Sequence, residues 1–104
     1  MAAKKNKLVL PPNRNVAIPV EISATCILYV MGRSTRKVDL HLMTWDEMSR
    51  FRSGQEFTGI FSIEKVTSFS QLWPLERGTY FLIFVNWGQN HSTTIDYTID
   101  YLPA

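Results

Sequence analysis

Tyr80–Val85, YFLIFV in one-letter code, is a run of six aromatic and aliphatic residues with Gly78 shortly before it and Gly88 shortly after it. Short apolar runs that are rich in aromatic and β-branched residues and bounded by turn residues are typical of buried strands. An exposed strand of this composition would promote aggregation. The sequence therefore predicts an interior strand at 80–85, covered on both of its faces.

On both sides of this run, apolar and polar residues alternate with a period of two, which is typical of half-buried strands. The pattern predicts strands at 15–23, where Pro19 indicates an edge or a bulge, and at 94–101, beside the 80–85 strand. Strands are also predicted at 25–31 and 38–43, joined by a hairpin loop, and at 56–66. Residues 67–76 are expected to form a connection, and Asp39, His41 and Met43 to point outward.

Thr44 and Glu47 have the spacing of a capping box, and Gly54 follows as a stop signal, so one or two helical turns are expected between them. We expect this helix to be too short to contribute to the architecture. Seven to eight short strands with at most one short helix indicate an all-β fold, an antiparallel two-sheet β-sandwich of jelly-roll type. A single domain is expected over residues 1–104.

The segment from Gly78 to Gly88 (GTYFLIFVNWG), followed by Thr94–Ile99 (TIDYTI), resembles the final hairpin of GOLD-like and bacterial pre-peptidase C-terminal-type β-sandwiches. The resemblance covers roughly residues 77–101 and implies a jelly-roll-like sandwich used for binding rather than catalysis. No functional residue transfers by position. The chain lacks an acidic cluster near its N-terminus, so calcium binding is not carried over.

Charge and composition limit the partners. The net charge is +2, and Lys4, Lys5 and Lys7 lie in residues 1–7, which are predicted to be a flexible basic tail. Without these three charges the rest of the chain has a net charge of −1, which argues against nucleic acid as a partner. No apolar run is long enough for a membrane span or a signal peptide, and the single cysteine, Cys26, excludes an internal disulfide. These absences favour a cytoplasmic location.

Catalytic and metal-binding patterns are weak. His41 and Asp39 share a strand face, but the chain has two histidines and one thiol, and Cys26 lies on a different face pattern from His41, so the three or four ligands of a zinc site are not brought together. Cys26 lies among apolar neighbours, where a thiol is usually inert. We therefore expect no catalytic residue, no metal and no cofactor. A small hydrolase would need a pocket that holds His41 or His91 beside Cys26 or a serine.

The three tryptophans are the strongest candidates for a binding site, because all of them fall at or beside predicted turns. Exposed tryptophans anchor protein interfaces and stack on sugars, although each could instead close one end of the sandwich. Polar side chains beside Trp87 would supply hydrogen bonds. The candidate binding residues are Trp87, Asn86, Asn90, His91, Trp45 and Trp73, with Gln89 also in this loop.

The leading hypothesis is a non-enzymatic protein-interaction or structural module, whose partner is another protein or a second copy of the chain in a homo-oligomer. The first alternative is a carbohydrate-binding module that uses exposed tryptophans, and the second is a small hydrolase with a dispersed site. No membrane partner is expected.

Overall fold

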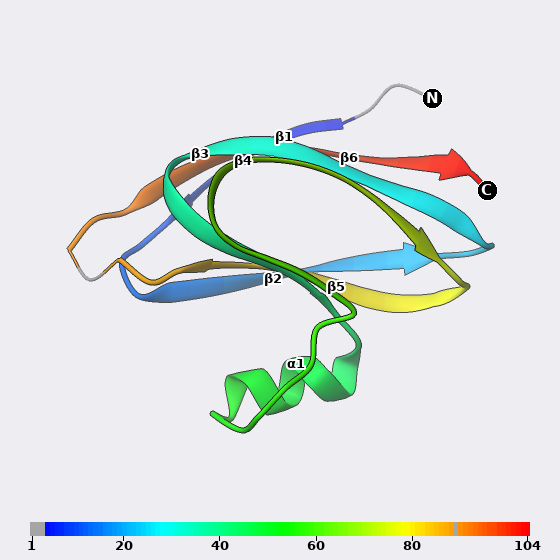
Figure 1. Cartoon of the computed structure of the whole chain (residues 1–104), viewed down its shortest axis with the longest axis horizontal. Coiled ribbons are helices and arrows are strands. Elements are labelled where there is room, and N and C mark those ends of the chain that lie inside the picture. Colours follow the sequence, from blue (N-terminus) through cyan, green and yellow to red (C-terminus); the bar gives the residue numbers. More distant parts are fainter. Residues whose placement is uncertain (1–3, 89) are drawn as a thin grey trace.

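The computed structural model describes residues 4–88 and 90–104, and over these residues it has an all-β fold with one short helix (Figure 1). The prediction of an all-β, antiparallel fold is confirmed. In chain order the elements are β1 (Lys4–Leu10), β2 (Arg14–Ile22), β3 (Cys26–Met43), α1 (Trp45–Arg52), β4 (Phe61–Leu75), β5 (Gly78–Asn86) and β6 (Thr93–Pro103).

All six strands belong to one antiparallel sheet, in the order β1-β6-β3-β5-β2, and β4 pairs with the other edge of β3. Residues 26–34 of β3 pair with β6, whereas residues 39–43 pair with β5. The long β3–β4 pair thus bends from one layer into the other, and the sheet curls into a half-barrel (Figure 1). The prediction of two separate sheets with seven or eight strands is corrected to one curled sheet of six.

The predicted hairpin loop at 32–37 does not exist, because β3 continues through it with register shifts against β4 between Arg33 and Leu40. Gly32 marks a close approach of two strands instead of a turn: a Cβ there would lie 2.2 Å from the carbonyl oxygen of Asp96 on β6. Residues 67–76 are likewise not a connection, since residues 67–75 lie within β4.

The predicted interior strand is confirmed as β5, which lies between β3 and β2, and Pro19 lies on β2 at the edge of the sheet. However, β5 and β6 do not pair with each other as the predicted final hairpin requires. They lie in different layers, and each pairs with β3. The resemblance to GOLD-like and pre-peptidase C-terminal-type sandwiches stays a prediction.

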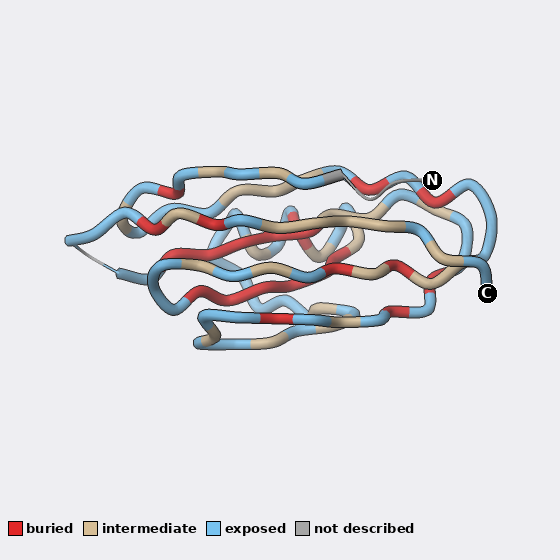
Figure 2. The backbone as a smooth tube through the Cα atoms, turned by 90° about the horizontal axis from the view of Figure 1, so that it is seen from above, coloured by how far each residue is buried: buried red, intermediate tan, exposed pale blue. Residues whose placement is uncertain are grey.

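The core has two parts. The larger part fills the space between the layers and includes Leu28, Leu40 and Phe84. The smaller part lies on the outer face of β3 and β5, where Met43 and Ile83 pack against Met48 of α1. Because both faces are covered here, residues 38–43 of β3 and 82–86 of β5 form continuous buried runs, whereas peripheral strands alternate (Figure 2).

Two expectations about this outer face were wrong. Asp39, His41 and Met43 do not face solvent; their exposed fractions are 6%, 4% and 0%. The helix is therefore an architectural element, since it covers part of the outer face of β3 and β5. No helix in the described residues is long and apolar enough to cross a membrane.

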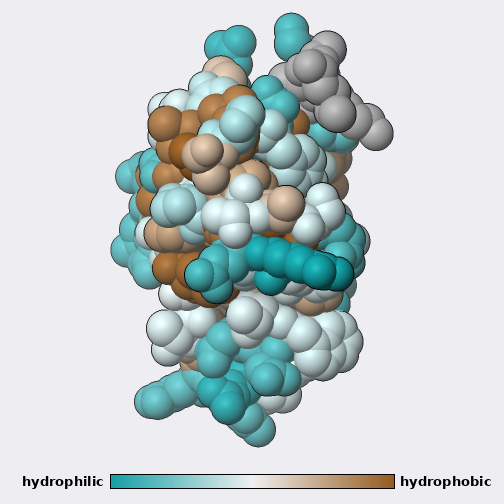
Figure 3. Space-filling view, turned by 90° about the vertical axis from the view of Figure 1, so that its right-hand side faces the viewer, coloured by the Kyte–Doolittle hydropathy of each residue, from teal (hydrophilic) through white to brown (hydrophobic). Residues whose placement is uncertain are grey.

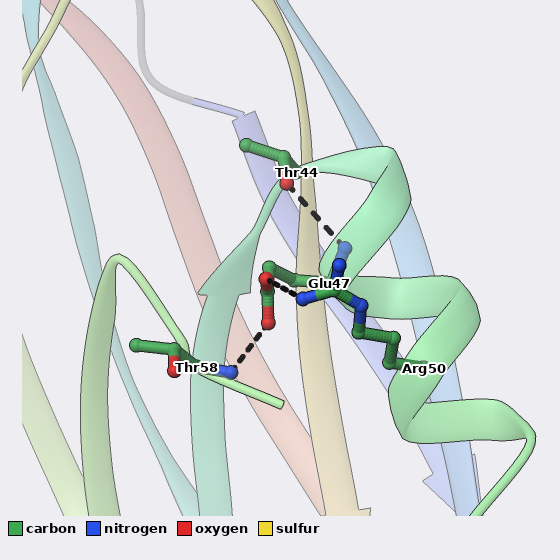
Figure 4. A network of polar contacts seen from close by, with 4 residues as sticks. All are labelled: Thr44, Glu47, Arg50 and Thr58. Atoms are coloured by element: carbon green, nitrogen blue, oxygen red, sulfur yellow. Dashed lines mark hydrogen bonds and ion pairs between the residues drawn. The ribbon is translucent and has the colours of Figure 1, made fainter. Parts of the chain in front are cut away.

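The N-terminus of α1 forms as its sequence predicts, with one difference (Figure 4). Thr44 is the N-cap, and its side chain accepts a hydrogen bond from the backbone N–H of Glu47. The carboxylate of Glu47 accepts from Arg50 at 3.0 Å and from the backbone N–H of Thr58. It thereby ties the segment that follows the helix to its first turn instead of closing a capping box.

The predicted flexible tail is also corrected. From Lys4 onward the segment is β1, which pairs with β6 through Leu10 and buries that side chain. The apolar residues Leu8 and Leu10 contribute to the core and hold the strand in place. Residues 1–3 lie outside the described part of the chain. The lysines at 5 and 7 therefore belong to the folded body, and their charges cannot be subtracted from it.

Candidate interaction surface

Four segments that are distant in sequence meet at one end of the half-barrel, on the left in Figure 1. They are the β1–β2 turn, the β5–β6 loop, the irregular part of β3 at 34–37 and the part of β4 around Lys65. Hydrogen bonds connect them: Asn13 N–H donates to Gly88 O at 2.8 Å, and Arg36 N–H donates to the Thr93 hydroxyl at 3.1 Å. This end is thus a composite surface with a defined shape.

Asn86 fixes two of these segments and does not face a ligand. Its side chain is 1% exposed, and Nδ2 donates to the carbonyl oxygens of Leu10, Pro11 and His91 at 2.9–3.2 Å. Its Oδ1 accepts from the Gly88 N–H at 3.0 Å. Buried side-chain amides normally have hydrogen-bond partners for both their nitrogen and their oxygen. Asn86 is therefore corrected from a binding residue to a structural clamp.

Trp87 is 57% exposed and is nevertheless fixed in position. Its Nε1–H donates to Oδ2 of Asp39, a carboxylate that is 6% exposed. Oδ1 of Asp39 accepts the backbone N–H of Lys65 at 2.9 Å, where the backbone has a positive φ of 53°. One buried carboxylate therefore holds both the indole ring and an unusual backbone conformation of β4.

Trp87 stands between two hollows. The first has a volume of about 350 Å³, and the second lies toward the C-terminal end of α1. The first is lined by Arg36, Lys37, Asp39, Lys65, Asn86, Trp87, Gly88 and His91, and the second by Asn13, Asn15, Phe51, Arg52 and Trp87.

The cations that line these hollows have no acidic partner within ion-pair distance. In residues 4–88 and 90–104 the one ion pair joins Arg50 to Glu47, which is a different pair. Arg36, Lys37, Lys65 and Asp39 were not among the predicted site residues. Asp39 alternates with apolar neighbours along its strand, and this pattern predicted that it faces solvent. No sequence pattern places residue 65 beside residue 87.

The other predicted site residues do not form one group. Asn90 and His91 are exposed in the loop after Trp87, and Gln89 lies outside the described residues. Trp45 is 61% exposed at the start of α1, where its ring lies 5.8 Å from that of Phe81. Trp73 is 4% exposed and stacks on Phe61 inside the barrel. It is corrected from a binding residue to a core residue.

His41 and Ser62 have the contact of a base and a nucleophile, with Nδ1 and Oγ 2.7 Å apart. The surroundings do not complete a catalytic site. Burial lowers the pKa of His41, against the opposing charges of Asp39 and Glu64. The rings of Phe51 and Phe57 pack on the imidazole, and the serine hydroxyl lies against Gly59. Asp39 is already bonded to Trp87 and Lys65, so it does not orient His41.

Metal binding has no support in the described residues, which contain no cluster of three or more histidine, cysteine or acidic side chains that could hold an ion. Cys26 is a free, half-buried thiol at the start of β3, far along that strand from His41. The imidazole of His91 shares its hollow with neither a serine nor a cysteine.

Comparison with known proteins supports the fold. No family model matches the sequence. No curated protein matches it significantly. Among solved structures, the periplasmic inhibitor of g-type lysozyme from Aeromonas hydrophila, PliG, is similar, with a TM-score of 0.61. The match covers 94% of this chain and 86% of the inhibitor at 10% sequence identity. The class that the fold defines is thus a curled antiparallel β half-barrel, shared with this inhibitor.

Proposed function

We propose that this chain is a non-enzymatic protein-binding module and that the surface around Trp87 is its recognition site. The observation that carries the proposal is an exposed tryptophan held by a buried carboxylate. Binding normally costs the side-chain entropy of the residues that it immobilises. Here the hydrogen bond to Asp39 fixes the indole before a partner arrives. A rigid aromatic side chain of this kind is the typical anchor of a protein interface.

The similarity in fold to a lysozyme inhibitor is consistent with this proposal, since that protein acts by contacting another protein. A glycan-binding role has less support. Sugar-binding sites need polar groups beside the aromatic ring, and of the three amides that line the two hollows Asn86 spends both its Nδ2 and its Oδ1 on backbone groups, which leaves Asn13 and Asn15. The two hollows beside Trp87 are also open and suit a protruding protein segment better than a buried small ligand.

The test compares Trp87→Ala with Trp45→Ala, a matched control because the two side chains are exposed to similar extents, 57% and 61%. Immobilised wild-type protein is used to measure the binding of a g-type lysozyme first, and then of proteins retained from the source cells. Light scattering tests for a second copy of the chain. We expect Trp87→Ala to weaken partner binding by about 30-fold, the loss typical of an interface anchor.

Trp45→Ala should leave the affinity within about twofold of wild type. Equal retention of the partner by Trp87→Ala and wild type would contradict the proposed site. The absence of any retained protein or self-association would contradict the function.

A further inference from the structure

We infer that the partner presents an acidic protein segment to the Trp87 surface, an inference that rests on the proposed function and specifies its ligand. Three residues with cationic side chains, Arg36, Lys37 and Lys65, line the hollow on one side of Trp87, and because its exposed lining is mainly apolar, their charged groups do not form its wall. A fourth, Arg52, lines the hollow on the other side. An aromatic anchor with cations on both sides suits carboxylates that flank an apolar or aromatic side chain.

The positive charge of this surface is not neutralised within the chain. The one carboxylate that lines the first hollow is Asp39, whose two oxygens accept the Lys65 backbone N–H and the Trp87 Nε1–H. Three side-chain cations against one buried anion leave an excess of positive charge around Trp87. Surface charges of one sign raise the local concentration of opposite charges and speed association with them.

The other end of the half-barrel lacks this excess. The β4–β5 turn there carries Glu76 beside Arg77, and Glu21 accepts hydrogen bonds from Thr79. Figure 3 faces this end and shows apolar areas separated by polar side chains. The cationic cluster around an aromatic is therefore a local property of the Trp87 end, and net charge alone does not explain it.

A protein segment fits the surface better than a nucleic acid. Single-stranded nucleic acids are held by stacking successive bases on several aromatic side chains along a basic groove. The hollows beside Trp87 contain one exposed indole. The other exposed tryptophan, Trp45, lies seven residues from Arg52 on α1, which corresponds to about 10 Å along the helix.

The first experiment measures the local potential without any partner. In Trp45→Phe, Trp87 is the exposed tryptophan and Trp73 is buried, so quenchers act mainly on Trp87. We expect the ratio of iodide to caesium quenching to be at least about twofold higher than the ratio for free N-acetyltryptophanamide, because cations attract iodide. Adding Arg36→Glu and Lys37→Glu should lower the ratio to that of the free compound. A ratio in Trp45→Phe equal to that of the free compound would overturn the inference.

The second experiment uses a fluorescein-labelled oligoglutamate peptide with one central phenylalanine, and its oligoglutamine counterpart. Arg36→Glu with Lys37→Glu should weaken binding of the acidic peptide by about tenfold and flatten its salt dependence. The control, Lys5→Glu with Arg77→Glu, changes the net charge equally. Arg77 lies beyond the opposite end of β5, about 30 Å from Trp87. The control should keep the affinity within about twofold.

Three outcomes would overturn the inference: equal binding of the oligoglutamine peptide, tighter binding of oligothymidylate than of the acidic peptide, or equal losses in the two double variants. The results also distinguish failure of the proposed site from failure of the acidic-partner inference. If Trp87→Ala leaves the binding of a captured partner unchanged, the site itself is wrong. If Trp87→Ala weakens binding but the reversal of Arg36 and Lys37 does not, the site stands and the acidic partner is rejected.

Discussion

Trp45 and Trp87 expose nearly the same fraction of their surface, 61% and 57%, but their attachments differ. The Trp45 ring lies beside Phe81 at the start of α1, a non-directional contact that permits rotation. The indole N–H of Trp87 is bonded to the buried Asp39, which also holds the backbone of β4. The comparison shows that two tryptophans of similar exposure differ in how they are held, and the proposed recognition site rests on that difference.

The largest expected effect comes from removing the carboxylate that distinguishes the two regions. Asp39→Ala leaves the Lys65 N–H without its acceptor, frees Trp87 and removes a buried side chain, so we expect a loss of about 2–4 kcal/mol in the free energy of unfolding. Asp46→Ala, beside Trp45 and exposed, should cost less than about 1 kcal/mol, the usual value of a charge at a helix N-terminus. Urea denaturation measures both values, and similar losses would show that Asp39 has no special role.

A smaller difference is expected when only the indole nitrogen is removed. Trp87→Phe keeps an aromatic ring but deletes the donor to Asp39, so the loss in unfolding free energy should be about 1–2 kcal/mol. Trp45→Phe keeps the contact with Phe81 and should cost less than about 0.5 kcal/mol. Thermal and urea unfolding of the two variants provide the comparison. A larger loss in Trp45→Phe would reverse our assignment of the fixed tryptophan.

The smallest expected effect is a pH dependence on the α1 side, where Phe51 packs on His41. Burial lowers the native-state pKa of His41 below 6.5, so the unfolded chain binds the proton more tightly. This contribution to stability is fully present above pH 6.5 and is lost as the pH falls toward the native-state pKa. Unfolding measured from pH 7.5 to 5 should show this slope in wild type.

Two variants test whether His41 causes the pH dependence of the unfolding free energy. His41→Asn keeps a polar group near Ser62 and should reduce the slope, whereas His91→Asn, in the exposed loop beside Trp87, should leave it unchanged. An unchanged slope in His41→Asn would assign the pH dependence to other groups.

Local patterns were sufficient to predict the strand class, the edge position of Pro19, the interior position of Tyr80–Val85 and the Thr44 cap. They failed where the cause is distant in sequence. Gly32 suggested a turn because the approach of β6 is invisible locally. Residues 67–76 were predicted to be a connection because the curvature of β4 interrupts the alternation of buried and exposed residues. The Lys-rich start of β1 suggested a flexible tail because its pairing partner, β6, lies at the other end of the chain.

The same limit applies to the site. The Trp87 loop was selected from sequence because its composition is that of a turn with an aromatic side chain. The residues that hold this loop, Asp39 and Lys65, were not selected, because they reach Trp87 only through the pairing of β3 with β4 and β5. Asn86 and Trp73 were mistaken for binding residues for the same reason. An amide beside a turn and a tryptophan beside Pro74 do not reveal burial until the layers are assembled.

The bent β3 strand also has a kinetic consequence. It pairs with β4, β5 and β6, so neither layer has its full complement of strands until β3 is in place. The partners that β3 must meet are separated from it by up to 77 positions along the chain, as in the pairing of Cys26 with Pro103. Closing such long loops before any contact compensates for them slows folding. The two layers therefore should not fold one after the other as independent units, and unfolding should be a single transition whose rate is set by the release of β3.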